Sequence, residues 1–557
     1  MILGIDVGGT HTDAVLIDHG GIKRKAKVPT DAENLVHSLL NVTGVLLDGE
    51  NPERLDRVVL STTISTNAIV QRKTDRVGMV LASGPGVHPS QLTLEKDVHF
   101  ISGYVNHRGI EVSKVDEAEL RQIKKYFKTD GIENVGIVGK FSTRNPRQEL
   151  QIRDFLKDDL TQISLGHRMS GHLNFPRRIA TTYLNAAVSK LYGRFVQEVL
   201  TFVRHQGISV PIYILKADGG TFDITQSLEF PVQTILSGPA ASIMGILAMS
   251  RCREDAIALD IGGTTTDIAI FADGVPLLEA FGVRIDEHKT LIRGLRTKSI
   301  GLGGDSCVRF DNEKLTIGPD REGPAAAFEG QCPTPTDAMI VLGLTRIGDR
   351  EKAVAAIMTI AEKMHSPIEE AAKRIFDQAC QTIVSQIKRV IEEINNQPVY
   401  TIHEMLDGKK LNPKTLHVVG GPAEPMAPYL GQLLDCPVFI PEHAEVANAI
   451  GAALARTTAE LTILADTEQK MLTIAEDGYQ TAIPSHFGRE DAIRIGQEKL
   501  REKAIKMGAA EEDIEMEVIE NQEFNMIKQF YTTGKNIRVK LQVKPGLISG
   551  FKAGAFR

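Results

Sequence analysis

Apolar residues along the chain fall into short runs separated by glycine turns or by stretches with helical spacing. The first eighteen residues predict a strand, a tight Gly-Gly-Thr turn and a second strand, and IKRKAKVPT predicts a third strand after Gly20 and Gly21. Residues 31–47 have helical spacing, with Asp31 as a candidate N-cap. The later runs VVLSTT, GMVLAS and VGIVGKF alternate with polar or helical stretches, which predicts an α/β sheet.

The opening hairpin pattern occurs a second time near the middle of the chain. The segments ILGIDVGGTHTDAVLIDHGGI and IALDIGGTTTDIAIFADGVPL share Asp, Gly, Gly, Thr, Thr and Asp at equal spacing. This self-similarity predicts an internal duplication, with two similar lobes that each begin with the same hairpin. The hydrophilic segment SRCREDA precedes the second copy and suits a boundary near residue 255.

Two long helices and a distinct C-terminal segment complete the predicted organisation. Helical spacing extends over RRIATTYLNAAVSKLYGRFVQEVLTFVRHQ and over IEEAAKRIFDQACQTIVSQIKRVIEEI. After about residue 457 the chain becomes charge-rich; IRIGQEKLREKAIKMGAAEEDIEMEVIE predicts a helix and NIRVKLQVKPG a strand. We therefore expect three domains, formed by residues 1–255, residues 256–456 and a small α+β domain of residues 457–557.

Composition narrows the function classes. The chain has 557 residues, too many for one hydrophobic core, with 42 % apolar and 24 % charged residues, as in ordinary globular proteins. Its net charge is −7 and no dense basic run occurs, which argues against a nucleic-acid partner. No segment reaches the roughly 20 apolar residues of a membrane span, and the opening MILGIDVGG lacks a signal peptide's basic region. We expect a cytoplasmic protein with no membrane partner.

The five cysteines lie far apart in the sequence. They are Cys252, Cys307, Cys332, Cys380 and Cys436. No pair has the close spacing of a zinc or redox motif, and a disulfide framework is implausible in so large a chain. We expect these cysteines to be reduced and mostly buried.

The two Gly-Gly-Thr turns offer the backbone N–H groups and hydroxyls that a triphosphate needs. Such N–H concavities bind anions, and glycine permits the backbone geometry. Asp6 and Asp260 each stand at a strand end and are candidate Mg²⁺ ligands, acting through water because magnesium dehydrates reluctantly. The alternative is two ordinary hairpins with capping aspartates. The candidate phosphate-binding residues are Gly8, Gly9, Thr10 and Thr12 in the first copy and Gly262, Gly263, Thr264 and Thr265 in the second.

Three further clusters of small residues follow in order. The segment SIGLGGDSC contains Gly303, Gly304 and Asp305, and LHVVGGPAEPM places Gly420 and Gly421 directly after a predicted strand. The segment VANAIGAALA, at 446–455, predicts a helix that can pack closely against another helix. Each cluster alone predicts only structure, but together they extend the candidate nucleotide site, with Asp305 as a candidate catalytic residue.

This order of motifs resembles the actin, Hsp70 and sugar kinase superfamily of ATPases, over residues 1 to about 456. The resemblance implies two ribonuclease-H-like lobes around a nucleotide cleft, with ATP and Mg²⁺ as cofactors. DVGGT and DIGGT look like its two phosphate loops, and VVGGP like its adenosine motif. LSGPAASIMGI, at 236–246, and VANAIGAALA look like its two connecting helices.

Six blocks are similar to the hydantoinase A and 5-oxoprolinase family, between about residues 140 and 456. They are HLNFPRRIATTYLNAAV, LKADGGTFD, PVQTILSGPAASIMG, DIGGTTTD, CPTPTDAMIVLG and GGPAEPM. Two departures leave the substrate open. The family's Ser-Asp-Gly-Gly block lacks its serine at 216–220, and its Asn-Pro-x-His-Glu element lacks the histidine at 145–149.

The resemblance implies an ATP-dependent amidohydrolase subunit that activates a hydantoin- or oxoproline-like cyclic amide by phosphorylating its carbonyl oxygen. A hydantoinase B-like second subunit is the candidate partner. Two alternatives stay open: an ATP-dependent ketone carboxylase subunit that works through an enol phosphate, and a non-enzymatic ATP-driven switch such as a reactivating chaperone.

Three more residues are candidates for the same site. Asp218 is expected to face the cleft. Arg178 is a candidate ligand for a substrate carboxylate, although an arginine at the start of a long helix more commonly lies on the surface. Asp337, in TPTDA, is expected to be a helix N-cap rather than a cleft residue.

Overall fold

The computed structural model describes residues 1–9, 11–31, 35–86, 97–250, 252–396 and 410–551. These residues form two compact units. Unit 1 contains Met1–Gly238, Glu279–Gly294 and Ala452–Phe551, and unit 2 contains Pro239–Leu278 and Leu295–Gly451. The C-terminal segment from Ala452 onward therefore belongs to the same compact unit as the N-terminal segment. The division into three domains that the sequence suggested stays a prediction.

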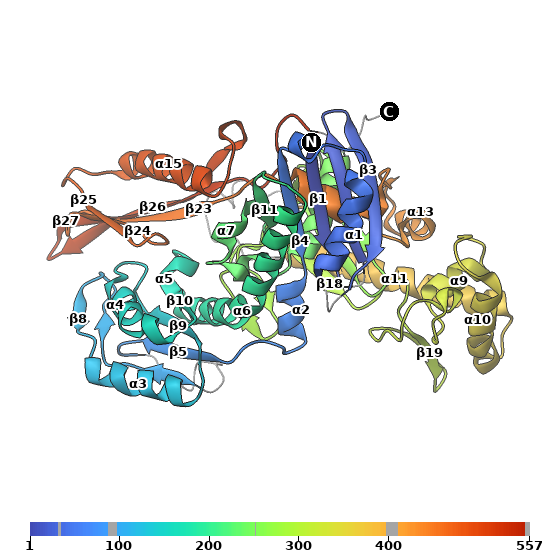
Figure 1. Ribbon diagram of the computed structural model, residues 1–557, viewed down its shortest axis with the longest axis horizontal. Helices are drawn as coiled ribbons and strands as arrows, with labels where there is room; N and C mark the ends of the chain where they lie inside the picture. Colours follow the sequence, from blue (N-terminus) through green and yellow to red (C-terminus); the bar gives the residue numbers. More distant parts are fainter. Residues whose placement is uncertain (10, 32–34, 87–96, 251, 397–409, 552–557) are drawn as a thin grey trace. The chain divides into compact units, whose positions relative to one another are not determined.

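The central sheet of unit 1 has six strands in the order β12-β11-β4-β1-β2-β3. β1 runs parallel to β4, and β4 runs parallel to β11, while β1–β2–β3 is an antiparallel meander. Figure 1 shows these strands in blue and green, because a long insertion separates β4 from β11 in the sequence. The bounds are β1 Ile2–Val7, β2 His11–Asp18, β3 Gly21–Pro29, β4 Arg57–Thr62, β11 Ile212–Leu215 and β12 Thr221–Asp223.

The central sheet of unit 2 repeats this topology. Its order is β15-β14-β13-β21-β22, and β18 pairs with β14. β13 and β14 form the antiparallel hairpin, and β21 and β22 continue in parallel, as β4 and β11 do in unit 1. The predicted duplication is therefore present in the fold as well as in the sequence. The bounds are β13 Ala256–Ile261, β14 Thr266–Ala272, β15 Val275–Pro276, β18 Thr297–Ile300, β21 Thr415–Val419 and β22 Val438–Phe439.

Helices bury the apolar faces of both sheets. In unit 1, α1 (Leu35–Leu47) and the long α6 (Phe175–His205) share a core with Leu3, Ile5 and Leu60. In unit 2, α11 (Ile368–Asn395) and α13 (Ala423–Leu434) pack on Leu259 and Val418. Both long helices lie where the helical spacing predicted them. Unit 2 also contains α9 Pro335–Val341 and α10 Arg350–Met364.

The insertion in unit 1 forms a second α/β layer. Its sheet has the order β10-β9-β5-β6, with all strands parallel. The runs GMVLAS and VGIVGKF supply its central strands, as predicted. The bounds are β5 Val77–Ala82, β6 Val98–Phe100, β9 Asn134–Gly139, β10 Gln162–Leu165, α2 Ile64–Val70, α3 Glu117–Thr129, α4 Arg147–Leu156 and α5 Gly166–Met169.

The C-terminal residues form a five-stranded antiparallel sheet in the order β25-β24-β23-β27-β26, with α15 on one face. The predicted helix over 493–520 is wrong in its second half. α15 ends at Lys506, Gly508 follows with a positive φ of 93°, and residues from Met516 onward belong to β26. Most residues of β26 are exposed, so the strand shows no alternation of apolar and polar positions. The bounds are β23 Glu460–Asp466, β24 Met471–Ile474, β25 Tyr479–Ala482, α15 Arg489–Lys506, β26 Met516–Lys528 and β27 Tyr531–Val543.

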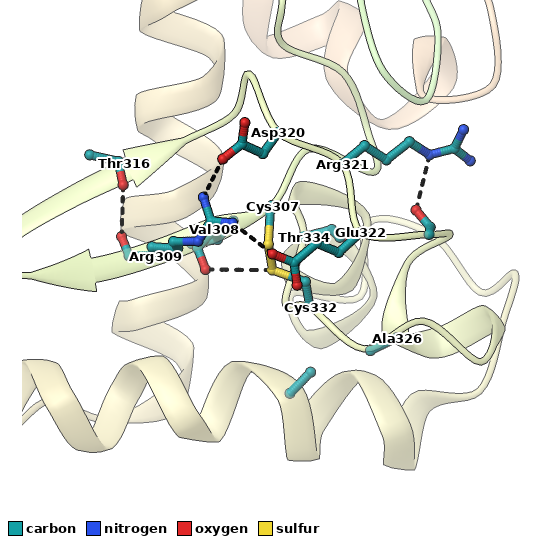
Figure 2. The surroundings of a disulfide bond; sticks show 12 residues. Cys307, Val308, Arg309, Thr316, Asp320, Arg321, Glu322, Ala326, Cys332 and Thr334 are labelled. Atoms are coloured by element: carbon teal, nitrogen blue, oxygen red, sulfur yellow. Dashed lines mark hydrogen bonds and ion pairs between the residues drawn. A yellow bond between two sulfur atoms is a disulfide. The ribbon is translucent and has the colours of Figure 1, made fainter.

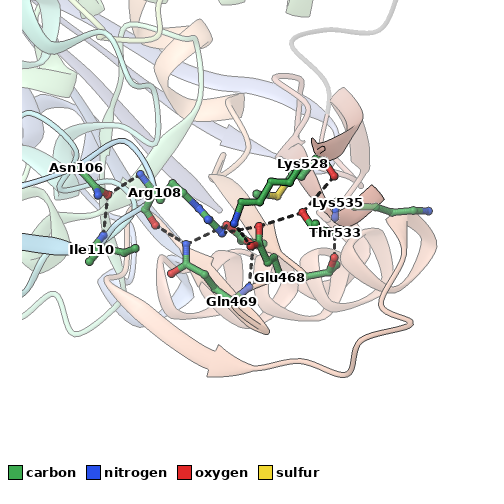
Figure 3. Close-up of polar contacts among 11 residues, drawn as sticks. Asn106, Arg108, Ile110, Glu468, Gln469, Lys528, Thr533 and Lys535 are labelled. Carbon is green, nitrogen blue, oxygen red and sulfur yellow. Dashed lines mark hydrogen bonds and ion pairs between the residues drawn. The ribbon is translucent and has the colours of Figure 1, made fainter. Parts of the chain in front are cut away.

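Polar contacts attach this sheet to the insertion of unit 1 (Figure 3). The guanidinium of Arg108 lies 3.1 Å from carboxylate oxygens of both Asp466 and Glu468, and Gln469 donates to the Arg108 carbonyl at 2.9 Å. Arg108 belongs to the turn between β7 (Tyr104–Val105) and β8 (Glu111–Ser113). In the part of the chain that the structure describes, no helix has the length and apolar composition that a membrane crossing requires.

Candidate functional site

The two hairpins have the same turn. The Gly8 amide donates to the His11 carbonyl at 3.1 Å, and the Gly262 amide donates to the Thr265 carbonyl at 2.9 Å. Each turn therefore closes with the same hydrogen bond at the same position of the repeat. Gly9 and Thr265 are exposed. Thr10 was predicted to bind phosphate, but it lies outside the described residues.

Each hairpin also places two aspartates opposite each other. Asp6 pairs with Asp13 across β1 and β2, and Asp260 pairs with Asp267 across β13 and β14. Residues directly opposite in an antiparallel pair point to the same face of the sheet. Each hairpin thus has a pair of carboxyl groups on one face of its strands, close to the turn. The sequence comparison found the second aspartate of each repeat but assigned it no role; its equal spacing in both copies was the available signal.

The two carboxyl pairs have different neighbours. In the first pair, the Lys27 ammonium lies 3.0 Å from Asp13 Oδ2, and Lys27 stands directly opposite Asp13 on β3. In the second pair, the residue opposite Asp267 is Ser299 on β18. Burial and the nearby charge of Asp260 raise the pKa of Asp267 to about 7, with a Ser299 hydrogen bond acting in the opposite direction.

A glycine cluster closes around the second turn, within unit 2. The Gly304 amide donates to the Gly262 carbonyl at 2.9 Å, and the Asp305 amide donates to the Gly263 carbonyl at 2.7 Å. A Cβ atom at Gly303 would lie 2.5 Å from the Gly262 oxygen. These contacts need glycine, and they bring two segments that the sequence separates by about 40 residues into one group.

Gly420 joins the same group from the end of β21. Its φ is +97°, and an added Cβ would lie 2.2 Å from the Ile261 carbonyl oxygen and 2.8 Å from Asp260 Oδ1. Only glycine fits so close to the aspartate. Gly421 next to it is exposed. The structure therefore assembles the candidate residues of unit 2, namely Asp260, Gly262, Gly263, Gly303, Gly304, Asp305 and Gly420.

Two small-residue helices support the second aspartate. They are α8 (Ser237–Met249) and α14 (Ala447–Leu454), as predicted. A Cβ at Gly245 would lie 2.1 Å from the Ala447 carbonyl oxygen, so the helices are in very close contact. Ser242 on α8 donates to Asp260 at 2.5 Å, and its Oγ also lies 2.8 Å from Asn448 Oδ1 on α14.

Asp305 is held by Arg321, whose Nη2 lies 3.2 Å from Asp305 Oδ2. Burial raises the pKa of Asp305, although Arg321 opposes this shift.

The expectation that all cysteines are reduced is wrong, because Cys307 and Cys332 form a disulfide (Figure 2). Their separation of 25 residues in the sequence concealed a close approach in space. Cys307 lies two residues after Asp305, so the disulfide joins the Asp305 segment to the residues that precede α9.

The expectation that Asp337 is an N-cap is also wrong. The N-cap of α9 is Thr334, and Asp337 is the third residue of the helix in a capping box. Asp337 is fully buried and accepts hydrogen bonds from the amides of Ala326 and Ala327 at 3.1 and 2.8 Å. The Thr336 hydroxyl donates to the Gly304 carbonyl at 2.8 Å, so the start of this helix holds the glycine cluster in place.

Neither expectation for Arg178 is confirmed by the structure of unit 1. Its side chain is completely buried, and it donates to the carbonyls of Gly139, Lys140 and His172 at 2.5–2.8 Å. Burial lowers the pKa of Arg178 to about 10. Because its Nη1 and Nη2 both donate to backbone oxygens, Arg178 holds the end of β9.

The departures from the family pattern also take structural roles. Gln148 replaces the family's histidine, is buried, and donates to Ser113 and Glu111 at 2.7 and 2.9 Å. Glu149 is buried and accepts from the His167 ring nitrogen Nδ1 at 2.5 Å.

Thr12 is fully buried beside Thr30, with their hydroxyl oxygens 2.9 Å apart. The hydroxyl of Thr12, which was predicted to bind phosphate, therefore contacts another side chain of unit 1 and is not exposed.

The residues present fit a magnesium nucleotide. In the first turn Gly9 is exposed and has no atom nearer than 3.7 Å to an added Cβ, and in unit 2 the glycines allow a close backbone approach beside Asp260. Carboxylates are suitable Mg²⁺ ligands, directly or through water. Asp6 and Asp260 are the strand-end carboxylates of the two hairpins.

Comparison with known protein families identifies the chain. Residues 2–160 match the model "Hydantoinase/oxoprolinase N-terminal region" and residues 178–461 match "Hydantoinase/oxoprolinase". The second match alone covers half of the chain. The protein therefore belongs to the hydantoinase/oxoprolinase family.

Curated relatives have low identity and different named activities. The caprolactamase subunit alpha of Pseudomonas jessenii is 27 % identical over 71 % of this chain and 63 % of its own length. The acetophenone carboxylase gamma subunit of Aromatoleum aromaticum is 25 % identical over 70 % of this chain and 61 % of its own. The chain thus spans less than two thirds of the length of these relatives.

Two solved structures share the fold across almost the whole chain. A nucleotide-free acetone carboxylase structure has a TM-score of 0.73 at 17 % identity, covering 99 % of this chain and 88 % of its own. The ATP-dependent caprolactamase from Pseudomonas jessenii has a TM-score of 0.73 at 21 % identity, covering 97 % and 87 %. Both likenesses concern the fold.

Proposed function

We propose that this chain is the ATP-dependent subunit of an enzyme that activates a carbonyl group, with a cyclic amide as its substrate. The observation that carries the proposal is the repeated hairpin, in which the same glycine turn, hydrogen bond and aspartate pair occur in both units. The common strand order of the two sheets supports two ribonuclease-H-like lobes of an actin-type ATPase.

In this proposal the turn residues bind the phosphates of ATP. They are Gly8, Gly9 and Thr10 in unit 1 and Gly262, Gly263, Thr264 and Thr265 in unit 2, with Gly303, Gly304, Gly420 and Gly421 completing the nucleotide site. Asp6 and Asp260 hold Mg²⁺, which when bound neutralises the charge that develops on the phosphates. Asp305 is the third catalytic candidate. The second pair places Asp267, whose pKa is raised to about 7, beside Asp260 and the glycine cluster.

The chemistry suits an unreactive amide. The amide oxygen attacks the γ-phosphorus, the bond between that phosphorus and the β,γ-bridging oxygen breaks, and ADP leaves. Water then adds to the activated carbon, and the ring C–N bond breaks with a proton transferred to nitrogen, which leaves an acyl phosphate. A second water hydrolyses this acyl phosphate to the carboxylate and inorganic phosphate. The protein has to position the groups and neutralise charge. Relatives named as a lactamase and as 5-oxoprolinases support a cyclic amide.

A ketone carboxylase subunit is the second candidate function. It is favoured by the acetophenone carboxylase and acetone carboxylase relatives and by the shared fold with acetone carboxylase. Several relatives are named as subunits, which supports a second polypeptide as partner. A switch without enzymatic activity has no comparable support among these relatives.

Phosphate release measured with a panel of small molecules tests the proposal. Hydantoins, lactams and small ketones are offered to the chain with and without a co-expressed partner subunit, and ring opening is followed in the same samples. We expect phosphate release that rises with a cyclic amide and is coupled to ring opening. Bicarbonate dependence with a ketone would instead support the carboxylase, and an ATPase rate that ignores every compound and partner would contradict both.

A further inference from the structure

A cavity of about 400 Å³ lies within unit 1, apart from the residues of the hairpin turns. Its wall comes from the β11–β12 turn, from the segment ending at Arg293, and from the C-terminal segment that includes β23 and α15. This volume lies in the range of small-molecule binding sites.

Buried charges of both signs form one part of the cavity wall. Asp218 is 2 % exposed, and it accepts hydrogen bonds from the Thr458 hydroxyl at 2.9 Å and the Gly220 amide at 3.0 Å. Arg293 Nη1 lies 3.3 Å from Asp218 Oδ2, and Lys216 Nζ lies 3.6 Å from the same atom. Burial opposes ionisation, but Lys216 and Arg293 keep the pKa of Asp218 below its usual value. One ionised carboxylate therefore faces two cations.

The neighbouring carboxylates are committed to other groups. Glu476 accepts from the amides of Gly171 and Thr462 at 3.0 and 2.9 Å and from the Thr462 hydroxyl at 2.7 Å. Glu460 forms an ion pair with Lys540 at 2.9 Å. Despite burial, Lys540 and Arg293 lower the pKa of Glu460 to about 2.

Arg293 therefore keeps an unused donor. Its Nη2 is buried and has no hydrogen-bond partner among the residues that the structure describes, while its Nη1 contacts Asp218. A buried charged donor without an acceptor is costly, and a guanidinium matches the two oxygens of a carboxylate. Of the lysines that α15 adds to the wall, Lys503 is paired with Asp477 at 3.3 Å and Lys506 adds positive charge. Apolar surface comes from Phe230, Val232 and Ile292.

The cavity lies at the same sheet edge as the first hairpin turn. Ile5, Leu60 and Ile214 are partners across the parallel strands β1, β4 and β11. Because the strands run in one direction, the Gly8 turn and Lys216 both follow the carboxyl ends of their strands. Two strand spacings of about 4.8 Å separate them, or roughly 10 Å.

We propose that this cavity binds a small organic carboxylate, whose carboxylate group accepts hydrogen bonds from Arg293. Lys216 and Asp218 position the guanidinium, and the apolar wall contacts the carbon skeleton. This inference deepens the proposed function and rests on it in one respect, since it narrows the substrate to a cyclic amide that carries a carboxylate. The binding itself needs no nucleotide.

Titration calorimetry without ATP or Mg²⁺ tests the cavity with a matched pair of probes. 5-Oxoproline and 2-pyrrolidinone have the same lactam ring and differ by one carboxylate; glutamate serves as the ring-opened probe. We expect 5-oxoproline or glutamate to bind, 2-pyrrolidinone to bind at least about tenfold more weakly, and Arg293→Gln to weaken carboxylate binding at least about tenfold. Arg293→Lys should retain part of the affinity. Arg194→Gln, an exposed position on α6, is the control and should bind as the wild type does.

Several outcomes would overturn the assignment. They are equal affinity for the two lactams, wild-type carboxylate binding by a folded Arg293→Gln variant, and absence of binding by either carboxylate probe. The thermal melting curve of each variant reports folding. Carboxylate binding without any lactam-dependent phosphate release would leave the cavity site standing and contradict the proposed function, whereas lactam-dependent phosphate release without carboxylate binding would do the reverse.

Discussion

The hairpins β1–β2 and β13–β14 share a turn, a register and an aspartate pair, but one position opposite the pair distinguishes them. Lys27 on β3 stands opposite Asp13, whereas Ser299 on β18 stands opposite Asp267. The first pair therefore has an ammonium group at 3.0 Å, and in the second pair the pKa of Asp267 is raised to about 7 by burial and by the charge of Asp260. Repeated local sequence sets the turn, while a third strand sets the charge of its carboxyl groups.

The largest expected difference concerns turnover. We expect Asp260→Asn to reduce the rate of phosphate release roughly 10²–10³-fold with little change in nucleotide affinity, because one stabilising charge is lost where phosphoryl transfer develops charge. Asp6→Asn should reduce the rate less, since Lys27 already neutralises part of the first pair. Phosphate release at saturating ATP measures both, with thermal melting as the control for folding. Equal losses, or wild-type turnover by Asp260→Asn, would show that the hairpins do not differ in this way.

The second difference is a dependence of stability on pH. A carboxyl group whose pKa is raised from 3.8 to about 7 in the folded state binds more protons there than in the unfolded state, so stability falls as pH rises from about 4 to 7. Asp267→Asn removes this loss. The gain at pH 8 should be about 1–3 kcal/mol, below the roughly 4 kcal/mol of a complete shift, because the side chain is only half-buried.

Denaturation of both proteins at pH 5 and pH 8, in EDTA and without nucleotide, measures this difference. The difference between the two proteins should be smaller at pH 5, where only part of the loss has occurred, and should grow by pH 8. A constant difference between them at both pH values would mean that Asp267 titrates normally.

A smaller difference follows from space at the second glycine of each turn. A Cβ at Gly263 would lie 2.6 Å from Asp305 Oδ2, whereas a Cβ at Gly9 has Asn67 Nδ2 at 3.7 Å as its nearest neighbour. Gly263→Ala should displace Asp305 and lower turnover about tenfold, equivalent to about 1.4 kcal/mol, and Gly9→Ala should stay close to the wild type. Steady-state phosphate release decides between them, and the same effect from both substitutions would remove the role assigned to Asp305.

The smallest expected effect comes from exchanging the opposing residues. Ser299→Lys should lower the pKa of Asp267 and flatten the pH dependence of stability, while Lys27→Ser should introduce such a dependence at the first hairpin. Cross-strand pairs of opposite charge contribute roughly 0.2–1 kcal/mol, and the Lys27 side chain is 45 % exposed. Denaturation curves at pH 5 and pH 8 report the change; unchanged pH profiles in both variants would mean that this cross-strand position does not control the carboxyl groups.

Much of the fold was predictable because it depends on local patterns. The duplicated hairpin, the helices α6 and α11, and the small-residue helix α14 follow from spacing and from glycine placement, whereas α8 was implied by the resemblance to the superfamily. The β26 strand was missed because most of its residues are exposed, so its sequence has no alternation of apolar and polar positions. Its partner β27 decides the conformation, and pairing between distant segments is not a local property.

In the candidate site, too, the features that depend on local sequence were predictable and those that depend on contacts between distant segments were not. Asp260 and the glycines around it were predicted, and the structure of unit 2 brings them together. The disulfide of Cys307 and Cys332, the backbone contacts of Arg178 and the capping role of Thr334 depend on segments that meet only in the folded chain. Arg293 had no sequence signal, since neither its neighbours nor its spacing distinguishes it from a surface arginine.

Titration calorimetry with a non-hydrolysable ATP analogue tests the central claim most directly, because the claim is that the repeated turns bind the phosphates of Mg-ATP. The account predicts binding that requires Mg²⁺ and is competed by ADP. The absence of heat with Mg²⁺ present, together with no competition by ADP, would contradict it.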